Sequence, residues 1–263
     1  MTLRRTLGLL AIVASVSACS PGSAAGRPVS LTVFGAASLK DALAALRSAY
    51  EASVPDTTLT IATDSSSTLR TQIEQGAPAD LFLSADQKNP QTLVDAGLTD
   101  GPAVDFAGNT LTVIVPPDNP AGIESPADLA RPGVKVVATG DDVPIATYAG
   151  RAVAKLAALP GYPTDYARAY AANIVSREQN VKAVVAKIEL GEGDAAIVYV
   201  TDARASKAVA TVAIPDAANV PATYAGIVVA ASIRHDEAHA FLEWLAGPAG
   251  AAILAGFGFL PPP

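Results

Sequence analysis

In the first part of the chain, β-rich runs alternate with segments of helical periodicity, and this alternation most restricts the possible folds. Strands are predicted at 31–34, 58–63 and 80–84, and helices at 39–50, 67–75 and 87–96. Short connections between such elements are typical of a parallel sheet covered on both faces by helices. We therefore predict an α/β fold.

Hydroxyl side chains follow the first two predicted strands. Ser38 is the predicted N-cap of the first helix, and Ser65, Ser66, Ser67 and Thr68 stand where the second helix begins. The first four N–H groups of a helix lack intrahelical partners, and the helix dipole adds positive charge there, so such a terminus can hold an anion without lysine or arginine. One hydroxyl would suffice as a cap. The cluster of hydroxyls therefore has two interpretations: an ordinary capped helix start in a polar loop, or additional donors at an anion site.

The pattern changes after Phe106. A long β run at 109–115 ends at Pro116-Pro117, and Ser125-Pro126 begins a short helix with proline in its first turn. Further strands are predicted at 134–138, 194–200, 209–214 and 226–231, and further helices at 146–159, 181–190, 236–245 and 248–257.

These elements suggest two α/β lobes, each a mainly parallel sheet flanked by helices, with a ligand cleft between them. A strand near 107–116 carries the chain out, and another near 223–231 brings it back. We expect lobe 1 to comprise 30–106 and 225–263, and lobe 2 to comprise 107–224.

The first residues have the features of a removable signal peptide, which we place at 1–18. Arg4 and Arg5 precede an apolar segment, and small residues follow it. Cys19 is the only cysteine, which excludes a disulfide within one chain. Its setting resembles the lipobox of bacterial lipoproteins, which implies diacylation and an extracytoplasmic protein anchored to the cell membrane. Ordinary signal-peptidase cleavage nearby, or an incidental cysteine, is the alternative. Residues 19–29 are then a flexible, lipidated tether.

The charge balance excludes one class of partner. Removing 1–18 takes away two arginines and no acid, which leaves 16 basic and 25 acidic side chains and a formal charge of −9. Nucleic-acid binding needs a basic footprint, so we expect no such partner. An anion site on this chain would have to work through local donors, against an unfavourable long-range field.

Signatures of catalysis are scarce. The chain has no Gly-x-Ser-x-Gly elbow, no phosphate-binding Gly-x-x-x-x-Gly-Lys, and no metal-ligand spacing of Cys and His. His235 and His239 stand four residues apart but lack a third ligand nearby, so we expect solvated surface residues. Asp141 and Asp142 could pair as a catalytic acid and base, but an acidic turn of this kind usually has no catalytic role.

Several motifs, in order, resemble the periplasmic molybdate-binding protein of ABC importers between about residues 30 and 259. They are Gly35-Ala-Ala-Ser-Leu39, Ser65-Ser-Ser-Thr-Leu69, Gly76-Ala-Pro-Ala-Asp-Leu-Phe-Leu-Ser-Ala85, Glu178-x-Asn-Val181, Ile197-Val-Tyr-Val-Thr-Asp-Ala203 and Gly247-Pro-Ala-Gly-Ala-Ala-Ile-Leu-Ala-Gly-Phe257. The resemblance implies a type II periplasmic-binding-protein fold. It also implies a protein without cofactor or metal-cation ligands that binds molybdate, and usually tungstate, as the oxyanion for an ABC permease. We expect a monomer, because this mode of delivery needs no symmetry.

The resemblance also implies site residues. Ser38 and Ser66 match the two ligand serines of the family, and Tyr199 matches the tyrosine whose hydroxyl reaches the oxyanion. Val181 matches a backbone N–H donor at a helix start. The remaining backbone donor falls on Ile145, in a turn that is shorter than in the family and has isoleucine for a small residue, so Ala146 is an alternative.

Hydroxyl and amide donors suit a tetrahedral dianion that carries no proton. Phosphate near neutral pH carries a proton and needs an acceptor, for which Asp64 or Asp141 would have to point inward. Sulfate has the same charge and shape as molybdate, so a receptor for sulfate or another tetrahedral oxyanion remains the first alternative. A hydrolase using a cleft serine is the second; it requires a base near that serine, yet no histidine lies in a candidate cleft segment.

Overall fold

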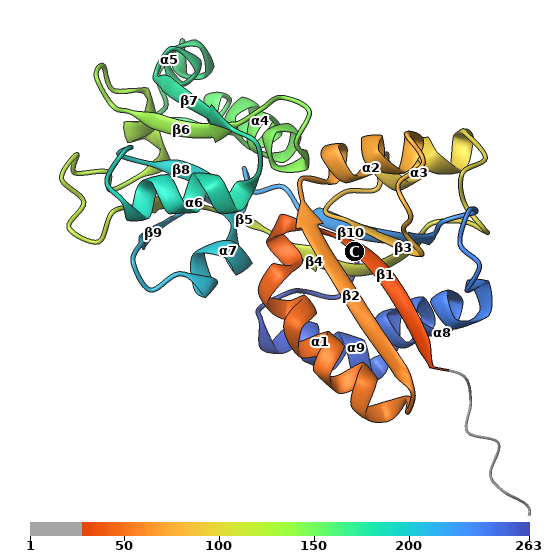
Figure 1. The fold of residues 1–263 in the computed structure, drawn as a ribbon. Helices are drawn as coiled ribbons and strands as arrows, with labels where there is room; N and C mark the ends of the chain where they lie inside the picture. Colours follow the sequence, from red (N-terminus) through yellow and green to blue (C-terminus); the bar gives the residue numbers. More distant parts are fainter. Residues whose placement is uncertain (1–27) are drawn as a thin grey trace, which may run out of the picture.

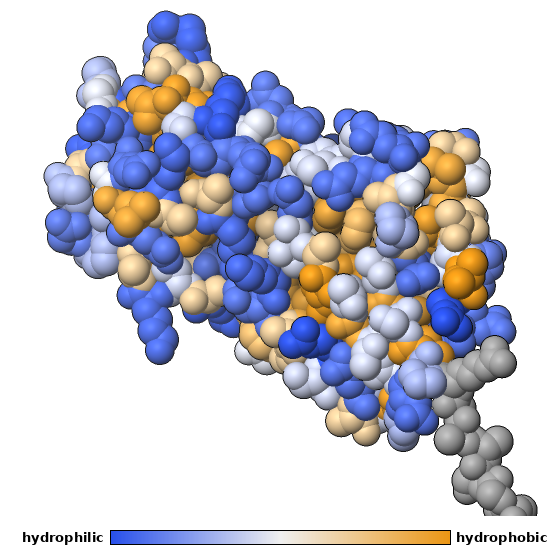
Figure 2. Space-filling model, viewed as in Figure 1, coloured by the Kyte–Doolittle hydropathy of each residue, from blue (hydrophilic) through white to orange (hydrophobic). Residues whose placement is uncertain are grey.

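The computed structural model describes residues 28–263, which form two α/β lobes (Figure 1). The expected signal peptide, Cys19 and most of the expected tether lie outside the described residues. Hydrophilic residues cover much of the second lobe on the face in Figure 2, while hydrophobic residues are more frequent over the first lobe. Within the described range, no helix combines the length and apolar character that a bilayer crossing requires.

The first lobe contains both ends of the described chain. Its elements are β1 (Val29–Ala36), the 3-10 turn η1 (Ala37–Leu39), α1 (Lys40–Ser53), β2 (Thr57–Asp64), α2 (Ser66–Glu74), β3 (Leu81–Ser84), α3 (Lys88–Asp95), β4 (Val104–Asn109), β10 (Ala222–Val228), α8 (His235–Ala246) and α9 (Pro248–Gly256).

The second lobe is formed by the middle of the chain. Its elements are β5 (Leu111–Val115), the 3-10 turn η2 (Pro126–Ala130), β6 (Val136–Thr139), α4 (Pro144–Ala157), α5 (Tyr166–Ala172), β7 (Ile174–Glu178), α6 (Val181–Glu189), β8 (Ala196–Tyr199), α7 (Val200–Ala205) and β9 (Ala210–Ala213).

The sheet of the first lobe has the strand order β2-β1-β3-β10-β4. As expected, β1 pairs in parallel with β2 and β3, while β10 is antiparallel to β3 and β4. Parallel strands end at the same edge of their sheet, so the turns that follow β1, β2 and β3 lie side by side. These turns carry the serines that the sequence singled out.

The chain passes between the lobes at Thr110. The single β run expected at 109–115 is two strands, because β4 pairs with β10 in the first lobe and β5 pairs with β8 and β9 in the second. At the junction, the Asn109 side chain accepts the Thr110 N–H at 2.9 Å. The boundaries expected at 106/107 and 224/225 therefore fall inside β4 and β10, and the strand pairing places the crossings at Thr110 and ahead of Ala222.

The second lobe differs from the expected mainly parallel sheet. β6 and β7 are parallel, but β5 is antiparallel to both β8 and β9. α5 and β7 were not predicted from the sequence. β7 has only one partner strand and no fully buried residue, which leaves a weak hydrophobic pattern.

Two side chains at the start of α6 reach across to the first lobe. The Asn180 amide nitrogen donates to Asp64 Oδ1 at 3.0 Å, and Lys182 Nζ lies 2.8 Å from Asp41 Oδ2. Lys182 Nζ also lies 3.3 Å from Asp202 Oδ1 in α7. Burial raises the pKa of Asp202 to about 6, although Lys182 opposes the shift. Burial would lower the pKa of Lys182, but Asp202 and Asp41 outweigh it and raise the pKa.

Asp202→Asn should remove one pH-dependent contribution to stability. The native pKa of Asp202, about 6, exceeds the ordinary 3.8, so between these pH values the native state binds more protons than the unfolded chain. The free energy of unfolding therefore falls as pH rises through this window, by up to about 3 kcal/mol from this group. Urea unfolding at about pH 4, 5, 6 and 7 should show a steeper fall for the wild type than for Asp202→Asn. Parallel curves would contradict the shifted pKa.

Candidate functional site

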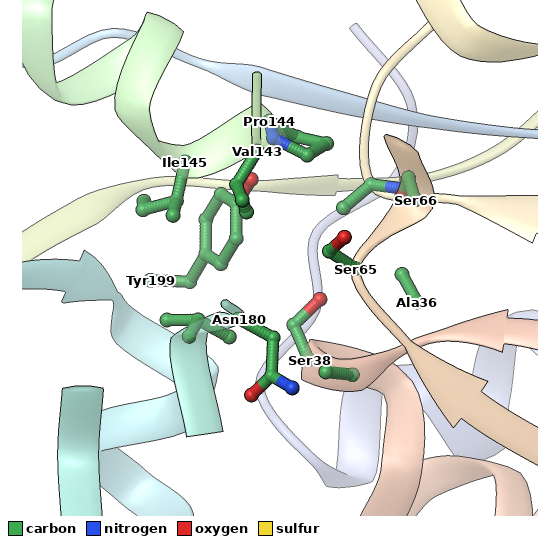
Figure 3. Close-up of a pocket in the computed structure, with 12 residues that line it drawn as sticks. Ala36, Ser38, Ser65, Ser66, Val143, Pro144, Ile145, Asn180 and Tyr199 are labelled. Atoms are coloured by element: carbon green, nitrogen blue, oxygen red, sulfur yellow. The ribbon is translucent and has the colours of Figure 1, made fainter. Parts of the chain in front are cut away.

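A small pocket lies between the lobes at the edge where β1 and β2 end (Figure 3). Its free volume is about 10 Å³ on the measure by which one water molecule needs roughly 10–15 Å³, so the pocket is narrow. The lining residues come from both lobes: Ala36, Ala37, Ser38, Ser65, Ser66, Ala85, Val143, Pro144, Ile145, Asn180, Val181 and Tyr199.

Ser38 lies inside η1, directly after β1. The expectation that it caps the first helix is wrong, because α1 has Leu39 at its N-cap position and no side-chain cap. Ser38 lies within the 3-10 turn that precedes α1, so the helix begins at Lys40, one residue later than expected, and Leu39 takes the N-cap position. The buried Ser38 Oγ instead lies 2.9 Å from the Tyr224 hydroxyl.

The serines at the start of α2 have different roles. Ser65 is the N-cap, and its Oγ accepts the Thr68 N–H at 3.1 Å. This leaves Ser66, the first helical residue, free of any capping role. Ser66 Oγ accepts the Ala85 N–H at 3.0 Å, and the residue is 1% exposed. The surplus hydroxyl therefore lies at the pocket, between the ends of β2 and β3.

Two helices of the second lobe point their N-termini at the pocket. Val181 is the first residue of α6, after Asn180, whose side-chain oxygen caps the helix through the Ala183 N–H at 3.1 Å. A first-turn amide such as that of Val181 has no intrahelical acceptor.

At the start of α4, Pro144 has no N–H, and the Ala146 N–H donates to Val143 O at 2.9 Å. Ile145 therefore offers the first available amide of α4, and it lines the pocket.

Tyr199 ends β8 and stands at the N-cap position of α7. It is 1% exposed, and its hydroxyl has no hydrogen-bond partner among the residues of the described chain. Burial, reinforced by the neighbouring Tyr224, raises its pKa well above 10. The hydroxyl therefore keeps its proton at neutral pH and remains available as a donor (Figure 3).

The side chains that line the pocket carry no formal charge. Its lining, which comes entirely from the described residues, includes no Asp, Glu, His, Lys or Arg. Asp64 is occupied by the Ser65 N–H at 2.7 Å and by Asn180, and Asp141 pairs with Arg177 at 2.7 Å on the surface. Both expected candidate acceptors thus have other partners. What remains is hydroxyl and amide donors at the positive ends of α2, α4 and α6.

The histidines that the sequence analysis considered as metal ligands lie outside the pocket. His235 Nδ1 and His239 Nε2 both approach Asp100 Oδ2, at 3.0 and 3.1 Å, so they are half-exposed partners of one carboxylate rather than freely solvated. Within the described range, no cluster of three or more His, Cys, Asp or Glu residues could hold a metal ion. No histidine or carboxylate in the described lining is placed to act as a base for a pocket serine.

Sequence reasoning missed two polar residues behind the pocket. Tyr224 in β10 contacts Ser38, and Asn109 at the end of β4 donates to the Tyr224 hydroxyl at 3.3 Å. Neither stands in a local motif, and no nearby pattern distinguishes them from other strand residues. Asn180 could have been found, since an asparagine before a helical run is a standard N-cap signal.

The sequence of this chain is similar to those of known proteins. Residues 31–260 match the family of bacterial extracellular solute-binding proteins. The chain is 35% identical to the molybdate-binding protein ModA of Mycobacterium tuberculosis over 259 residues, which are 95% of each chain. It is 34% identical to ModA of Escherichia coli over 265 residues, covering 97% of this chain and 98% of the relative.

Solved structures show the same fold. The periplasmic molybdate-binding protein of Azotobacter vinelandii superposes with a TM-score of 0.74 at 22% identity, covering 89% of this chain and 100% of the other. The α/β class and the type II periplasmic-binding-protein fold are thus confirmed. This chain belongs to the family of bacterial extracellular solute-binding proteins, among the periplasmic molybdate-binding members that serve ABC importers.

Proposed function

We propose that the protein captures molybdate, and also tungstate, outside the cytoplasm and delivers it to an ABC permease. It acts as a monomeric lipoprotein held to the cell membrane through Cys19. The observation that carries this proposal is that Ser38, Ser66, Val181 and Tyr199, with Ile145, line one pocket between the lobes. The similarity to molybdate-binding relatives supports the choice of ion.

The donor set matches the chemistry of such an ion. Molybdate carries no proton at neutral pH, so every contact that it makes must come from a donor. Each hydrogen bond to a charged group contributes roughly 1.5–3 kcal/mol, and several together must offset the loss of hydration and the ordering of the cleft. A micromolar Kd, about −8 kcal/mol, is within reach of this set.

Binding and closure are linked because the donors come from both lobes. Ser38 and Ser66 belong to the first lobe, whereas Ile145, Val181 and Tyr199 belong to the second. An anion that contacts both sets stabilises the closed arrangement over an open one. The closed form is the form that the permease recognises.

Ser38→Ala combined with Ser66→Ala should weaken molybdate binding by about 100-fold or more, because two charge-assisted hydrogen bonds are lost. Isothermal titration calorimetry measures the change. The matched control is Ser48→Ala with Ser53→Ala on α1, whose hydroxyls bond only to carbonyls of their own helix. Circular dichroism should show both double variants folded. Unchanged affinity in the Ser38/Ser66 variant would refute this assignment of the site.

A thermal-unfolding scan with molybdate, tungstate, sulfate and phosphate tests the choice of ion. A ligand that binds only the folded state stabilises it by RT ln(1 + c/Kd), where c is the ligand concentration, so at equal concentrations the tighter-binding ion raises Tm more. We expect large shifts with molybdate and tungstate and little shift with phosphate, which carries a proton near neutral pH. A larger shift with sulfate than with molybdate would identify the protein as a sulfate receptor instead.

Cys19→Ala should release the protein from the membrane. In the full chain expressed in a bacterium, the wild type should partition into the membrane fraction, because two acyl chains anchor stably. The Cys19→Ala variant should lose this partitioning and keep its affinity for molybdate. A wild-type protein recovered only in the soluble extracytoplasmic fraction would favour ordinary signal-peptide cleavage.

A further inference from the structure

A buried carboxylate lies directly behind the wall of the pocket. Asp86 follows Ala85, which lines the pocket, and Asp86 is only 9% exposed. After burial and the neighbouring Tyr224 and Tyr148, the charge of Asp86 is a further cause of the raised pKa of Tyr199. A negative charge so close to the pocket opposes the binding of an anion. Asp86 therefore needs a role other than attraction of the ligand.

The turn between β3 and α3 is tied to this carboxylate. Asp86 Oδ1 accepts the Ser84 hydroxyl at 2.8 Å and the Asn89 backbone N–H at 3.0 Å. The Asn89 side-chain amide donates to both carboxylate oxygens, each at 3.0 Å. Ser84 and Asn89 are buried as well. A carboxylate only accepts and has about four lone-pair sites, so it satisfies all of these donors at once.

Arg70 fixes the direction in which the Asn89 amide faces. Arg70 Nε, in α2, donates to Asn89 Oδ1 at 2.9 Å. A guanidinium group has no acceptor, so the Asn89 oxygen faces Arg70 and the Asn89 nitrogen faces Asp86. An asparagine in place of Asp86 would therefore turn its own NH₂ group toward a donor, and one attractive contact would become repulsive.

The turn held in this way directs one backbone group at the pocket. Ala85 stands between Ser84 and Asp86, and its N–H donates to Ser66 Oγ at 3.0 Å. Ser66 is the first residue of α2, and the cap of that helix is Ser65, so capping does not fix the Ser66 rotamer. Among the described residues, the Ala85 N–H is the one group hydrogen-bonded to Ser66 Oγ. The place of this hydroxyl thus depends on the Ala85 peptide, and the place of that peptide depends on Asp86.

We propose that Asp86 is a positioning residue of the anion pocket, which holds the turn after β3 so that the Ala85 N–H keeps the Ser66 hydroxyl in place for the ligand. This inference rests on the function proposed above. Asp86 acts through geometry and against its own charge, so the gain from a fixed hydroxyl exceeds the cost of the repulsion. A role through geometry and a role through charge alone predict opposite effects when the charge is removed.

Asp86→Asn separates the two roles, because it keeps the size of the side chain and removes the charge. We expect molybdate to bind about three- to tenfold more weakly, since the loosened turn no longer holds Ser66 and part of one charge-assisted hydrogen bond is lost. Charge alone would make binding tighter. Isothermal titration calorimetry measures the affinity.

The same substitution in two further backgrounds identifies the residue through which Asp86 acts. In Ser66→Ala, the hydroxyl that the turn holds is absent, so Asp86→Asn should cause no further loss of molybdate affinity. In Ser38→Ala, the Ser66 hydroxyl is present, so the three- to tenfold loss should remain. A general loss of packing would weaken binding equally in both backgrounds.

Asp80→Asn is the matched control. It removes the same charge from the same lobe, and Asp80 also accepts two hydrogen bonds, from the Thr32 N–H at 2.7 Å and from Ser232 Oγ at 2.6 Å. Asp80 precedes β3, at the end of the strand away from the pocket, so its substitution should leave the affinity unchanged.

Ser84→Ala is a second variant, which removes one donor from the turn and keeps the charge of Asp86. We expect about two- to threefold weaker binding, again only where Ser66 is present. Circular dichroism identifies the folded variants, and Ser84→Ala decides the result if Asp86→Asn does not fold.

Undiminished affinity in the deciding variant, or equal losses with and without Ser66, would overturn the proposal and leave the proposed function intact. A wild type that does not bind molybdate would refute the proposed function itself.

Discussion

The structure depends on hydrogen-bond donors that converge where no acceptor meets them. Helices α2, α4 and α6 begin at the pocket, so their unpartnered amides face it together with the hydroxyls of Ser38, Ser66 and Tyr199. In an empty, dry cavity such a set would be costly, because each buried donor loses its bond to water. An anion removes that cost for all of them at once. This convergence of donors is the feature on which the proposed anion site depends.

Local patterns in the sequence were enough to predict most of the helices and strands and several of the residues that line the pocket. Alternating strand and helix periodicity predicted the first sheet, and the serine cluster predicted spare hydroxyls at α2, because cap and helix residues are neighbours in the chain. Ser38 lines the pocket, but its predicted capping role was wrong, since it lies within a 3-10 turn and Leu39 takes the N-cap position of α1. Asn109 and Tyr224 could not be found, because their partners stand 115 and 186 residues away and only the folded topology brings them together.

The two crossing strands do more than connect the lobes. β4 and β10 pair with each other in the first sheet, so both crossings leave from neighbouring positions in one rigid element. The Asn109 amide joins this element to Thr201 in the second lobe. The same junction reaches the pocket, because the Tyr224 hydroxyl that accepts from Asn109 lies 2.9 Å from Ser38 Oγ.

The first turn of α6 has a consequence for unloading. Asn180, Val181 and Lys182 are consecutive, and the outer two bond to Asp64 and Asp41 across the cleft while the middle one presents its amide to the pocket. A small tilt of this helix end strains all three attachments together. Any separation of the lobes at this point therefore breaks both contacts across the cleft and moves the Val181 amide away from the first-lobe serines in the same movement.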